Sequence, residues 1–390
     1  MSRRSRRPAR PALAAAAAVL LAAALTAVAA GPAAAIGAFG PPVTIHDPPC
    51  DFDAYNVDLA QDGAGVAHGF VGMFGSDCNT AADITYVQGG GSSWTREATP
   101  YHGFVVAVAQ DTTGTYLLYA DSVRLDLRIT KRLADGTYTG GRVLSTHVGP
   151  DGSLAQGDVT AAGGQFWAVW REHVKAGGAA GDEFDQTDLF QARTIGGVQN
   201  RTRITTSPAW DSMPTVAVTP ATTFPVNLVW SRGGSDFGAN PADLRRATGN
   251  SAGAWTSSSF ATLGTFNFWP DATVVGTTTY VTWVRDGKAV AADNGGGAFT
   301  SHTFATPAIL SGPPSIAATA GDVVVGWTAP TSTSQRAFVA ERVGGTWTGA
   351  FASPSSATRL QELTNVTVTG GHAGAAIVSF GSRLYSATES

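Results

Sequence analysis

Short apolar and aromatic runs alternate with clusters of Gly, Pro, Asn, Asp and Ser throughout residues 36–390. This pattern predicts β-strands joined by turns, and no stretch has the period of about 3.6 residues expected of a long amphipathic helix. One kind of run recurs every 44 to 60 residues and ends at Phe70, Tyr119, Trp170, Trp230, Trp283, Trp327 and Phe380. Self-similarity at a period of about 50 residues is typical of a repeat protein.

Each of these runs has a shorter apolar run before it and another after it, and in most repeats a Gly-x-aromatic-Thr turn opens a fourth segment. One repeat, for example, contains Ala272–Val275, Tyr280–Trp283 and Ala289–Asp293, followed by the turn at Gly297. We therefore predict an all-β fold in which residues 36–390 form one domain, a seven-bladed β-propeller of four-stranded antiparallel blades. A jelly roll or a stack of sandwiches is the alternative, and it leaves the period unexplained.

The two ends of the repeat region are complementary. The last repeat contains a third run, Arg383–Thr388, but no fourth segment, whereas Val43–His46 stands alone ahead of the first repeat. Pairing between these two segments would close the ring and cover two exposed sheet edges. We predict this pairing.

Most of the large aromatic residues recur at equivalent positions of the repeats, which predicts that they pack in the core. Four tryptophans at one equivalent position are predicted to pack between blades: Trp170, Trp230, Trp283 and Trp327. The aromatic residues of the turns are predicted to anchor the fourth strands: Trp94, Trp255, Phe299 and Trp347. A sugar-binding row of aromatic residues is the alternative interpretation of these eight positions.

The Gly-x-aromatic-Thr turns are similar to the Asp-box of the sialidase-like (BNR-repeat) β-propeller superfamily. That motif reads Ser/Thr-x-Asp-x-Gly-x-Thr-Trp, and the copies here are degenerate, with Asn250, Asn294 and Arg342 where the motif has Asp. The resemblance implies a propeller fold with these turns on the face away from the active site. It carries over no activity, because the first repeat lacks the Arg-Ile/Leu-Pro segment of sialidases and because sialidases usually have six blades.

Residues 1–35 read as an export signal. They contain five Arg and no acid, an apolar run from Ala12 to Ala30, and a small-residue site that ends at Ala35. We therefore expect a secreted, extracellular protein, exported by either the general or the twin-arginine route. Because the five Arg leave with the leader, the net charge of −4 becomes −9. This acidic balance argues against nucleic acid and anionic membranes as partners, and we expect a soluble monomer.

Two cysteines lie in the expected mature chain, Cys50 and Cys78. In an oxidising compartment such a pair is usually a disulfide, and this one would stabilise the fold by about 3 kcal/mol. A catalytic or metal-binding role is the alternative, but neither cysteine belongs to a CxxC or Cys/His cluster.

In a propeller, the loops that lead into each first strand and out of each second strand meet on one face, which is the default ligand site. Arg171, Arg232 and Arg285 follow second strands in three consecutive repeats and together could hold a carboxylate or sulfate. The alternatives are three solvated arginines, or arginines paired with nearby acids such as Asp211, Asp236 or Asp286.

Further candidates lie on the same predicted face. Trp210 and Trp269 are candidates for stacking against a sugar, with a packing role as the alternative, and Tyr101 is a further candidate ligand-binding residue. Glu172 with His173, and His102 with Asp211, are candidate acid/base pairs, and solvated side chains are the alternative. No Walker loop, GxSxG or HExxH motif is present, so no cofactor is predicted.

The loop after Trp170 is rich in acids, and these are Asp182, Glu183, Asp185 and Asp188. Oxygen ligands at this density can bind Ca²⁺, but their spacing matches no EF-hand loop, and solvated acids are the alternative. We predict no other metal site.

The sequence favours a secreted β-propeller that recognises extracellular glycan or another polymer on its loop-rich face. The alternative is a polysaccharide-degrading enzyme, either a glycoside hydrolase or a uronate-type lyase, with an arginine-lined central site. An exported scaffold without a small ligand is the third possibility.

Overall fold

The computed structural model describes residues 42–46, 54–74, 83–90, 93–146, 156–174, 187–219, 226–233, 243–249, 255–261, 266–295, 298–304, 312–319, 321–330, 335–348, 351–352, 361–369, 372–379 and 383–388. Every regular element within these ranges is a β-strand. In the same ranges there is accordingly no helix that is long and apolar enough to cross a membrane.

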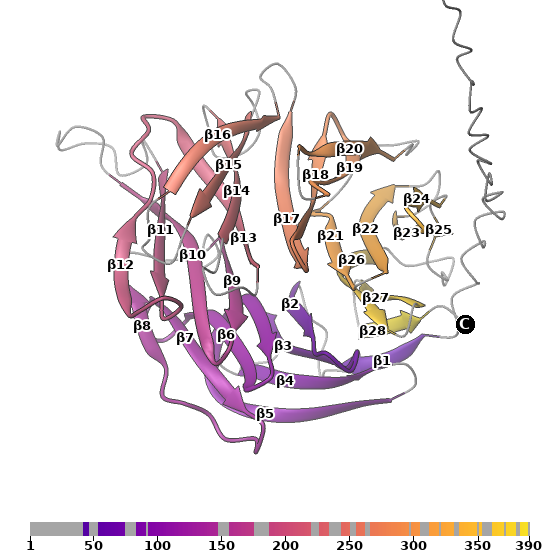
Figure 1. The fold of residues 1–390 in the computed structure, drawn as a ribbon. Helices are drawn as coiled ribbons and strands as arrows, with labels where there is room; N and C mark the ends of the chain where they lie inside the picture. Colours follow the sequence, from indigo (N-terminus) through magenta and orange to yellow (C-terminus); the bar gives the residue numbers. More distant parts are fainter. Residues whose placement is uncertain are drawn as a thin grey trace, which may run out of the picture. The chain divides into compact units, whose positions relative to one another are not determined.

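Figure 1 shows the strands in chain order. Their bounds are β1 Val43–His46, β2 Ala54–Gln61, β3 Ala67–Phe74, β4 Asp83–Gly90, β5 Ser93–Asp111, β6 Gly114–Asp121, β7 Asp126–Leu133, β8 Arg142–Ser145, β9 Gly157–Ala162, β10 Gln165–His173, β11 Thr187–Arg193, β12 Gln199–Arg203, β13 Trp210–Val218, β14 Val226–Gly233, β15 Asp243–Gly249, β16 Trp255–Ala261, β17 Asn267–Val275, β18 Thr278–Arg285, β19 Lys288–Asp293, β20 Thr300–Thr303, β21 Ser315–Ala318, β22 Asp322–Pro330, β23 Gln335–Val343, β24 Thr346–Trp347, β25 Phe351–Ala352, β26 Gln361–Thr369, β27 His372–Ser379 and β28 Arg383–Thr388.

The strands form antiparallel sheets, most of them four-stranded, so the all-β prediction is confirmed. Four sheets contain four strands each, namely β9–β12, β13–β16, β17–β20 and β26–β28 with β1. A fifth contains β21–β25, and the sixth runs without a break from β2 to β8. The middle strands are apolar on both sides because neighbouring sheets cover both of their faces; all eight residues of β6 are buried, for example.

The seven-stranded sheet arises because β5 has two sets of partners. Its first half pairs with β4 up to His102, and its second half pairs with β6 from Gly103 onward. Gly103 has a φ of 136°, and a Cβ at this position would lie 1.9 Å from the carbonyl oxygen of Ala120. Only glycine therefore permits this change of partner within one strand.

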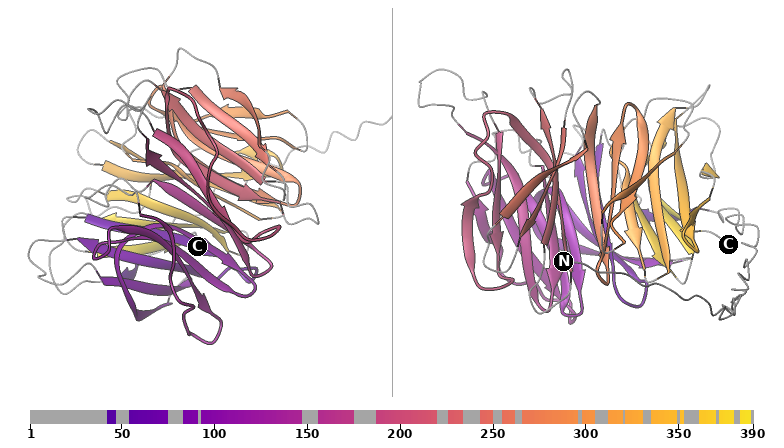
Figure 2. Two further views of the ribbon diagram at one scale, coloured as in Figure 1. Left: turned by 90° about the vertical axis from the view of Figure 1, so that its left-hand side faces the viewer. Right: turned by 45° about the horizontal axis from the view of Figure 1, so that its top comes forward.

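We call each run of consecutive strands that starts at β2, at the second half of β5, or at β9, β13, β17, β21 or β26 a group, and the strand at which it starts its first strand. First strands of successive groups pack against one another: β2 on β5, β5 on β9, β9 on β13, β13 on β17, β17 on β21, β21 on β26, and β26 on β2. Figure 2 shows the sheets standing face to face in chain order. Apolar clusters fill the space between consecutive groups, such as the one that joins Trp167 of β10 to Trp230 of β14. The four equivalent tryptophans are at most 1% exposed, as the packing prediction requires.

The predicted pairing of Val43–His46 with Arg383–Thr388 is present. β1 runs antiparallel to β28, with Val43 opposite Ser386 and Thr44 opposite Tyr385. The Arg96 Nε of β5 donates to the carbonyl oxygen of Ile45 at 2.6 Å, and the Trp94 indole nitrogen donates to Ser386 Oγ at 2.9 Å. Segments from the two ends of the described chain thus share one sheet and pack on the first group of strands.

Candidate functional site

A cavity of about 370 Å³ lies among the first strands. Its walls come from β2, the second half of β5, β9, β13, β17, β21 and β26, so every group contributes one strand to it. The site therefore depends on the arrangement of the sheets rather than on any single one of them.

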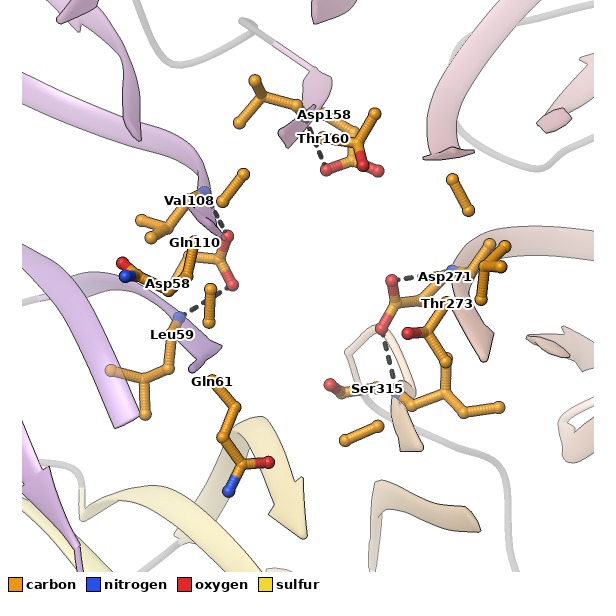
Figure 3. Close-up of a pocket in the computed structure, with 18 of the residues that line it drawn as sticks. Asp58, Leu59, Gln61, Val108, Gln110, Asp158, Thr160, Asp271, Thr273 and Ser315 are labelled. Carbon is orange, nitrogen blue, oxygen red and sulfur yellow. Dashed lines mark hydrogen bonds between the residues drawn. The ribbon is translucent and has the colours of Figure 1, made fainter. Parts of the chain in front are cut away.

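Three aspartates face this cavity from different sides: Asp58 of β2, Asp158 of β9 and Asp271 of β17 (Figure 3). Each carboxylate accepts the backbone N–H of the next residue in its own strand and a backbone N–H of the following first strand. Asp158, for example, accepts from the nitrogen of Val159 at 2.7 Å and from that of Val216 at 2.7 Å. None of the three is among the site residues predicted from the sequence.

The electrostatics of these aspartates are unusual. Burial raises the pKa of Asp158 to about 6, even though hydrogen bonds from Val216, Thr215 and Val159 act in the opposite direction. Burial and the charge of Asp158 raise the pKa of Asp271 to about 7. Burial and the other two carboxylates also raise the pKa of Asp58 well above its usual value. The three groups therefore interact across the cavity.

The rest of the lining is uncharged and polar or apolar. Among the described residues that line the cavity there is no Arg, Lys or His. Gln61, Gln110, Thr160 and Thr273 supply amide and hydroxyl groups. The cavity is therefore rich in hydrogen-bond acceptors and electrostatically unfavourable for an anion. The predicted arginine-lined central site is not found within the described part of the chain.

Two residues near the cavity have strained backbones. Met213 of β13 and Trp269 of β17 have φ values of 52° and 53°, and both stand in β-bulges. Trp269 lies two residues before the cavity-lining part of its strand, and Met213 lies three residues before. Bulky residues rarely adopt positive φ, and such strain is most often found at functional sites. Trp269, a predicted ligand-binding residue, is partly exposed.

Arg232, one of the three predicted anion-binding arginines, is paired within the protein. Its Nε and Nη2 atoms lie 2.6 and 2.9 Å from the carboxylate oxygens of Asp211. The same carboxylate accepts the Trp230 indole N–H at 2.8 Å and is fully buried. Of the alternatives weighed for Arg232, the structure therefore shows pairing, and it places the candidate acid/base residue Asp211 in that pair.

Arg285 has the same arrangement, but its acceptor is the neutral side chain of Asn267. Its Nε lies 3.4 Å from Asn267 Oδ1, and that oxygen also accepts the Trp283 indole N–H at 3.1 Å. Arg171, the third of these arginines, is 3% exposed in the middle of the sheet. The three side chains thus belong to three separate sheets, and none of them lines the cavity.

Glu172 and His173 do not form a free acid/base pair. Glu172 is 2% exposed and accepts from the Arg201 Nε at 2.9 Å and from the Trp170 indole at 2.6 Å. Burial alone would raise the pKa of Glu172, but these bonds lower it below its ordinary value. The His173 ring meets the Trp210 ring edge to face, with centroids 5.9 Å apart.

Tyr101 and His102 lie within β5 rather than on a loop, because the first two groups of strands share this strand. The Tyr101 hydroxyl lies 2.8 Å from Thr130 Oγ1, and its ring packs on Tyr119 and Tyr138. His102 Nδ1 lies 2.5 Å from Asp83 Oδ1 on the exposed surface. His102 is thus paired with Asp83, and Asp211, its predicted partner, is paired with Arg232.

The other predicted site residues were also expected on loops, but the structure places them in strands. Arg171, Glu172 and His173 belong to β10, and Trp210 and Trp269 belong to β13 and β17. The strands extend beyond their apolar runs because polar residues continue the pairing, as between Glu172 and Asp188.

Several predictions fall outside the described residues: the export signal, Cys50 and Cys78, and three of the proposed calcium ligands (Asp182, Glu183 and Asp185). The fourth, Asp188, is buried, bonded to Arg203 and accepts from Thr205 Oγ1 at 3.0 Å. Within the described ranges no group of three or more metal-ligating side chains is close enough to hold an ion.

A sequence signal for the cavity aspartates did exist. Asp58, Asp158 and Asp271 occupy the same register position in the first, third and fifth repeats, beside the apolar core of the first strand. An acid at an inner position of alternate repeats is unusual enough to suggest a shared cavity. Only the distances between repeats, which the sequence does not contain, show that the three meet.

Comparison of the sequence with protein-family models and with curated proteins gives no match. Solved structures with a similar chain path include a neuraminidase-like protein of a flat-faced bat isolate from Peru, with 10% identity, 85% of this chain and 96% of that chain covered, and a TM-score of 0.49. A fucose-specific lectin from Aleuria aurantia is 14% identical, with 79% of this chain and 100% of the lectin chain covered and a TM-score of 0.49. An α-L-arabinanase from Penicillium chrysogenum is 13% identical, with 75% of this chain and 94% of the arabinanase chain covered and a TM-score of 0.48. At these values the comparisons assign no function to this chain.

Proposed function

We propose that this chain is a secreted protein whose residues 36–390 form a single seven-bladed β-propeller after a 35-residue export signal. Counting the two halves of β5 separately divides the strands into seven groups of at least four, each with its first strand on the cavity. The seven contacts between first strands run from β2 through β26 and back to β2, as a closed ring requires. The pairing of β1 with β28 then supplies the outer strand of the last blade and closes the ring.

We infer that the propeller recognises an extracellular glycan at the centre of its ring. The observation that carries this inference is the central cavity, in which carboxylate, amide and hydroxyl groups converge from different blades. Carboxylates only accept hydrogen bonds, so the cavity suits a ligand that offers many donors, such as the hydroxyl groups of a sugar. Three carboxylates without a lining cation favour neutral or amine-bearing sugars over uronates.

Trp269 is the proposed stacking residue. It lies two residues before Asp271 on β17, in a strained bulge, and its ring packs edge to face on Phe268 at 5.6 Å. The indole is partly exposed, and its strand reaches the cavity lining two residues later, at Asp271. An exposed aromatic face can bind a sugar without selecting a charge. Met213 stands in the equivalent bulge of β13 and provides a matched position without a ring.

The test is binding of purified protein to neutral, amine-bearing and uronate-rich polysaccharides, measured by retention and calorimetry. Trp269→Ala should weaken binding by about tenfold or more, or about 1.4 kcal/mol, while Met213→Ala should change it by less than threefold. Equal losses for the two variants would remove Trp269 from the site. Failure to bind any polysaccharide, or a preference for uronates, would contradict the proposed function.

The second candidate is a polysaccharide-degrading enzyme. It is favoured by Asp158 and Asp271, because burial raises their pKa values to about 6 and 7, in the range that a general acid needs at neutral pH. Release of shorter sugars from a bound polysaccharide, abolished by Asp271→Asn, would favour this candidate. Binding without any product would favour recognition alone.

A further inference from the structure

The three cavity aspartates join neighbouring first strands. Asp58 accepts from the nitrogen of Leu59 in its own strand at 2.9 Å and from that of Val108 in β5 at 2.5 Å. Asp271 accepts from Ala272 at 2.8 Å and from Ile316 of β21 at 2.8 Å. With the equivalent contacts of Asp158, three junctions between inner strands are bridged by a carboxylate: β2–β5, β9–β13 and β17–β21.

The three bridges occur at every second junction between β2 and β21. The residues just before Val108, Val216 and Ile316 are Ala107, Thr215 and Ser315, which leave room for the incoming carboxylate. Thr215 adds a hydroxyl bond to Asp158 at 2.9 Å. Neutral groups serve at two other junctions, where Ser315 Oγ accepts from Val366 and Gln61 Oε1 accepts from Val368.

Among the described residues of the cavity wall, no positive charge balances the three carboxylates. The other ionisable side chains of the inner strands are directed elsewhere: Asp111 lies 4.0 Å from Lys131, Asp211 pairs with Arg232, Glu97 pairs with Arg132, and His102 pairs with Asp83. In β9, β17 and β21 no other charged residue occurs, and the side chain of Glu362 in β26 is outside the described part. Each carboxylate therefore meets mainly backbone N–H groups, hydroxyls and the other two acids.

Burial penalises the ionised forms and raises the pKa of Asp158 to about 6. Burial together with the charge of Asp158 raises the pKa of Asp271 to about 7. A protonated carboxyl still has an acceptor oxygen for the N–H groups and can turn its O–H toward the cavity. Asp58 and Asp158 each accept the N–H of their own strand and the N–H of the next first strand on different oxygens, so protonation weakens one of the two bonds and leaves the other on the carbonyl oxygen. Full ionisation, by contrast, places three negative charges around one cavity.

We propose that the three aspartates make the inner ring a proton-dependent lock, in which the first strands are held most tightly in mildly acidic solution and loosen as the carboxyls ionise. This lock does not depend on the glycan-binding proposal, because it concerns the free protein.

The direction of the effect follows from proton linkage. An aspartate in the unfolded chain has a pKa of about 3.9, so between about pH 4 and 7 the folded protein binds more protons than the unfolded one. The stability contributed by these groups is therefore complete below about pH 4 and is lost as the pH rises through the folded values near 6 and 7.

The experiment measures the thermal midpoint of the free protein from pH 4.5 to 8.5 in a chelating buffer, so that no adventitious cation neutralises the ring. The wild type should lose roughly 5–10 °C between pH 5 and 8. Asp158→Asn and Asp271→Asn should each flatten this fall, and the double variant should nearly remove it. Asp135→Asn is the control, because Asp135 is exposed and hydrogen bonds from Thr137 lower its pKa, so it stays ionised throughout.

A second measurement needs no variant to fold well. Calorimetric unfolding of the wild type at pH 6 in two buffers of different ionisation enthalpy reports the protons exchanged on unfolding, and carboxyl infrared bands report protonated carboxyls in the folded state. Net proton release and a protonated carboxyl band at pH 6 are the expected results. A midpoint that is flat or rises with pH, or a folded state without protonated carboxyls at pH 6, would overturn the proposal. Loss of glycan binding alone would leave it standing.

Discussion

Replacing Asp211 tests how the protein uses the arginines at its strand ends. The buried Asp211 carboxylate accepts from the Trp230 indole and from two nitrogens of Arg232. Asn267 holds the equivalent position on β17, where the bonds from Trp283 and Arg285 are longer, at 3.1 and 3.4 Å. The chain thus contains a charged and a neutral form of one arrangement, and Asp211→Asn and Asn267→Asp exchange them.

The expected magnitude follows from the partners that are lost. Asp211→Ala leaves the Trp230 indole N–H buried without an acceptor, at about 1–3 kcal/mol, and removes charge-assisted bonds worth about 1.5–3 kcal/mol. Because the Arg232 side chain is 24% exposed and can be rehydrated, we expect a loss of about 3–4 kcal/mol. Asp211→Asn keeps an acceptor for the indole and should lose only about 1–2 kcal/mol.

The assay is equilibrium urea unfolding at pH 7, followed by intrinsic fluorescence and circular dichroism. Asp211→Ala should lower the free energy of unfolding at least twice as much as Asp211→Asn. Asn267→Asp should stay within about 1 kcal/mol of the wild type, because Arg285 is already placed to pair with the new carboxylate. Equal losses for the two Asp211 variants, or a loss below about 0.5 kcal/mol for Asp211→Ala, would refute the assignment of Arg232 to a structural pair.

Two further predictions concern pH and the chain ends. Hydrogen bonds from Arg201 and its neighbours outweigh burial and lower the pKa of Glu172, so its contribution to stability is present above about pH 4.3 and is lost as the pH falls. Glu172→Gln should therefore lower the thermal midpoint at pH 7 and flatten its decline between pH 5 and 3, and an unchanged decline would contradict this role. Arg96→Ala removes the 2.6 Å bond to Ile45 and should speed hydrogen exchange in β1 more than in β14. Arg124→Ala, which removes an exposed guanidinium paired with Asp121, is the matched control. An equal effect from both variants would argue against a role of Arg96 in holding β1 in place.

The strand pattern was predictable because its causes are local. Alternating apolar residues bounded by Gly, Pro and Asn define strands wherever one or both sheet faces are covered, so runs such as Phe166–Trp170 and Tyr280–Trp283 lie inside observed strands, β10 and β18. The strand ends were less predictable. β10 continues through Arg171 to His173, and β5 joins two groups without a loop, because backbone pairing extends over polar residues when the neighbouring strand continues beside them.

The cavity was not predicted, and among the described residues none of the predicted site residues lines it. Trp269 and Trp210 were recognisable as aromatic residues outside the packing register. Whether Arg232 is free or paired, however, depends on Asp211, 21 residues earlier in the chain. The cavity aspartates were not predicted because a lone acid beside an apolar run usually lies at a solvated strand end. A repeat pattern indicates which positions are equivalent, but it does not indicate how far apart they lie.

The sequence by itself determined the all-β class, the repeat length, the buried tryptophans and the pairing of Val43–His46 with Arg383–Thr388, since each follows from side-chain periodicity and the need to cover sheet edges. The tertiary structure decided which polar groups meet: Asp58 with the backbone of Val108, 50 residues later, and three acids around one cavity. Hydrophobic burial is a property of single positions and can be read along the chain. Hydrogen bonds and charge repulsion act between specific atoms, and the packing of whole sheets sets their distances.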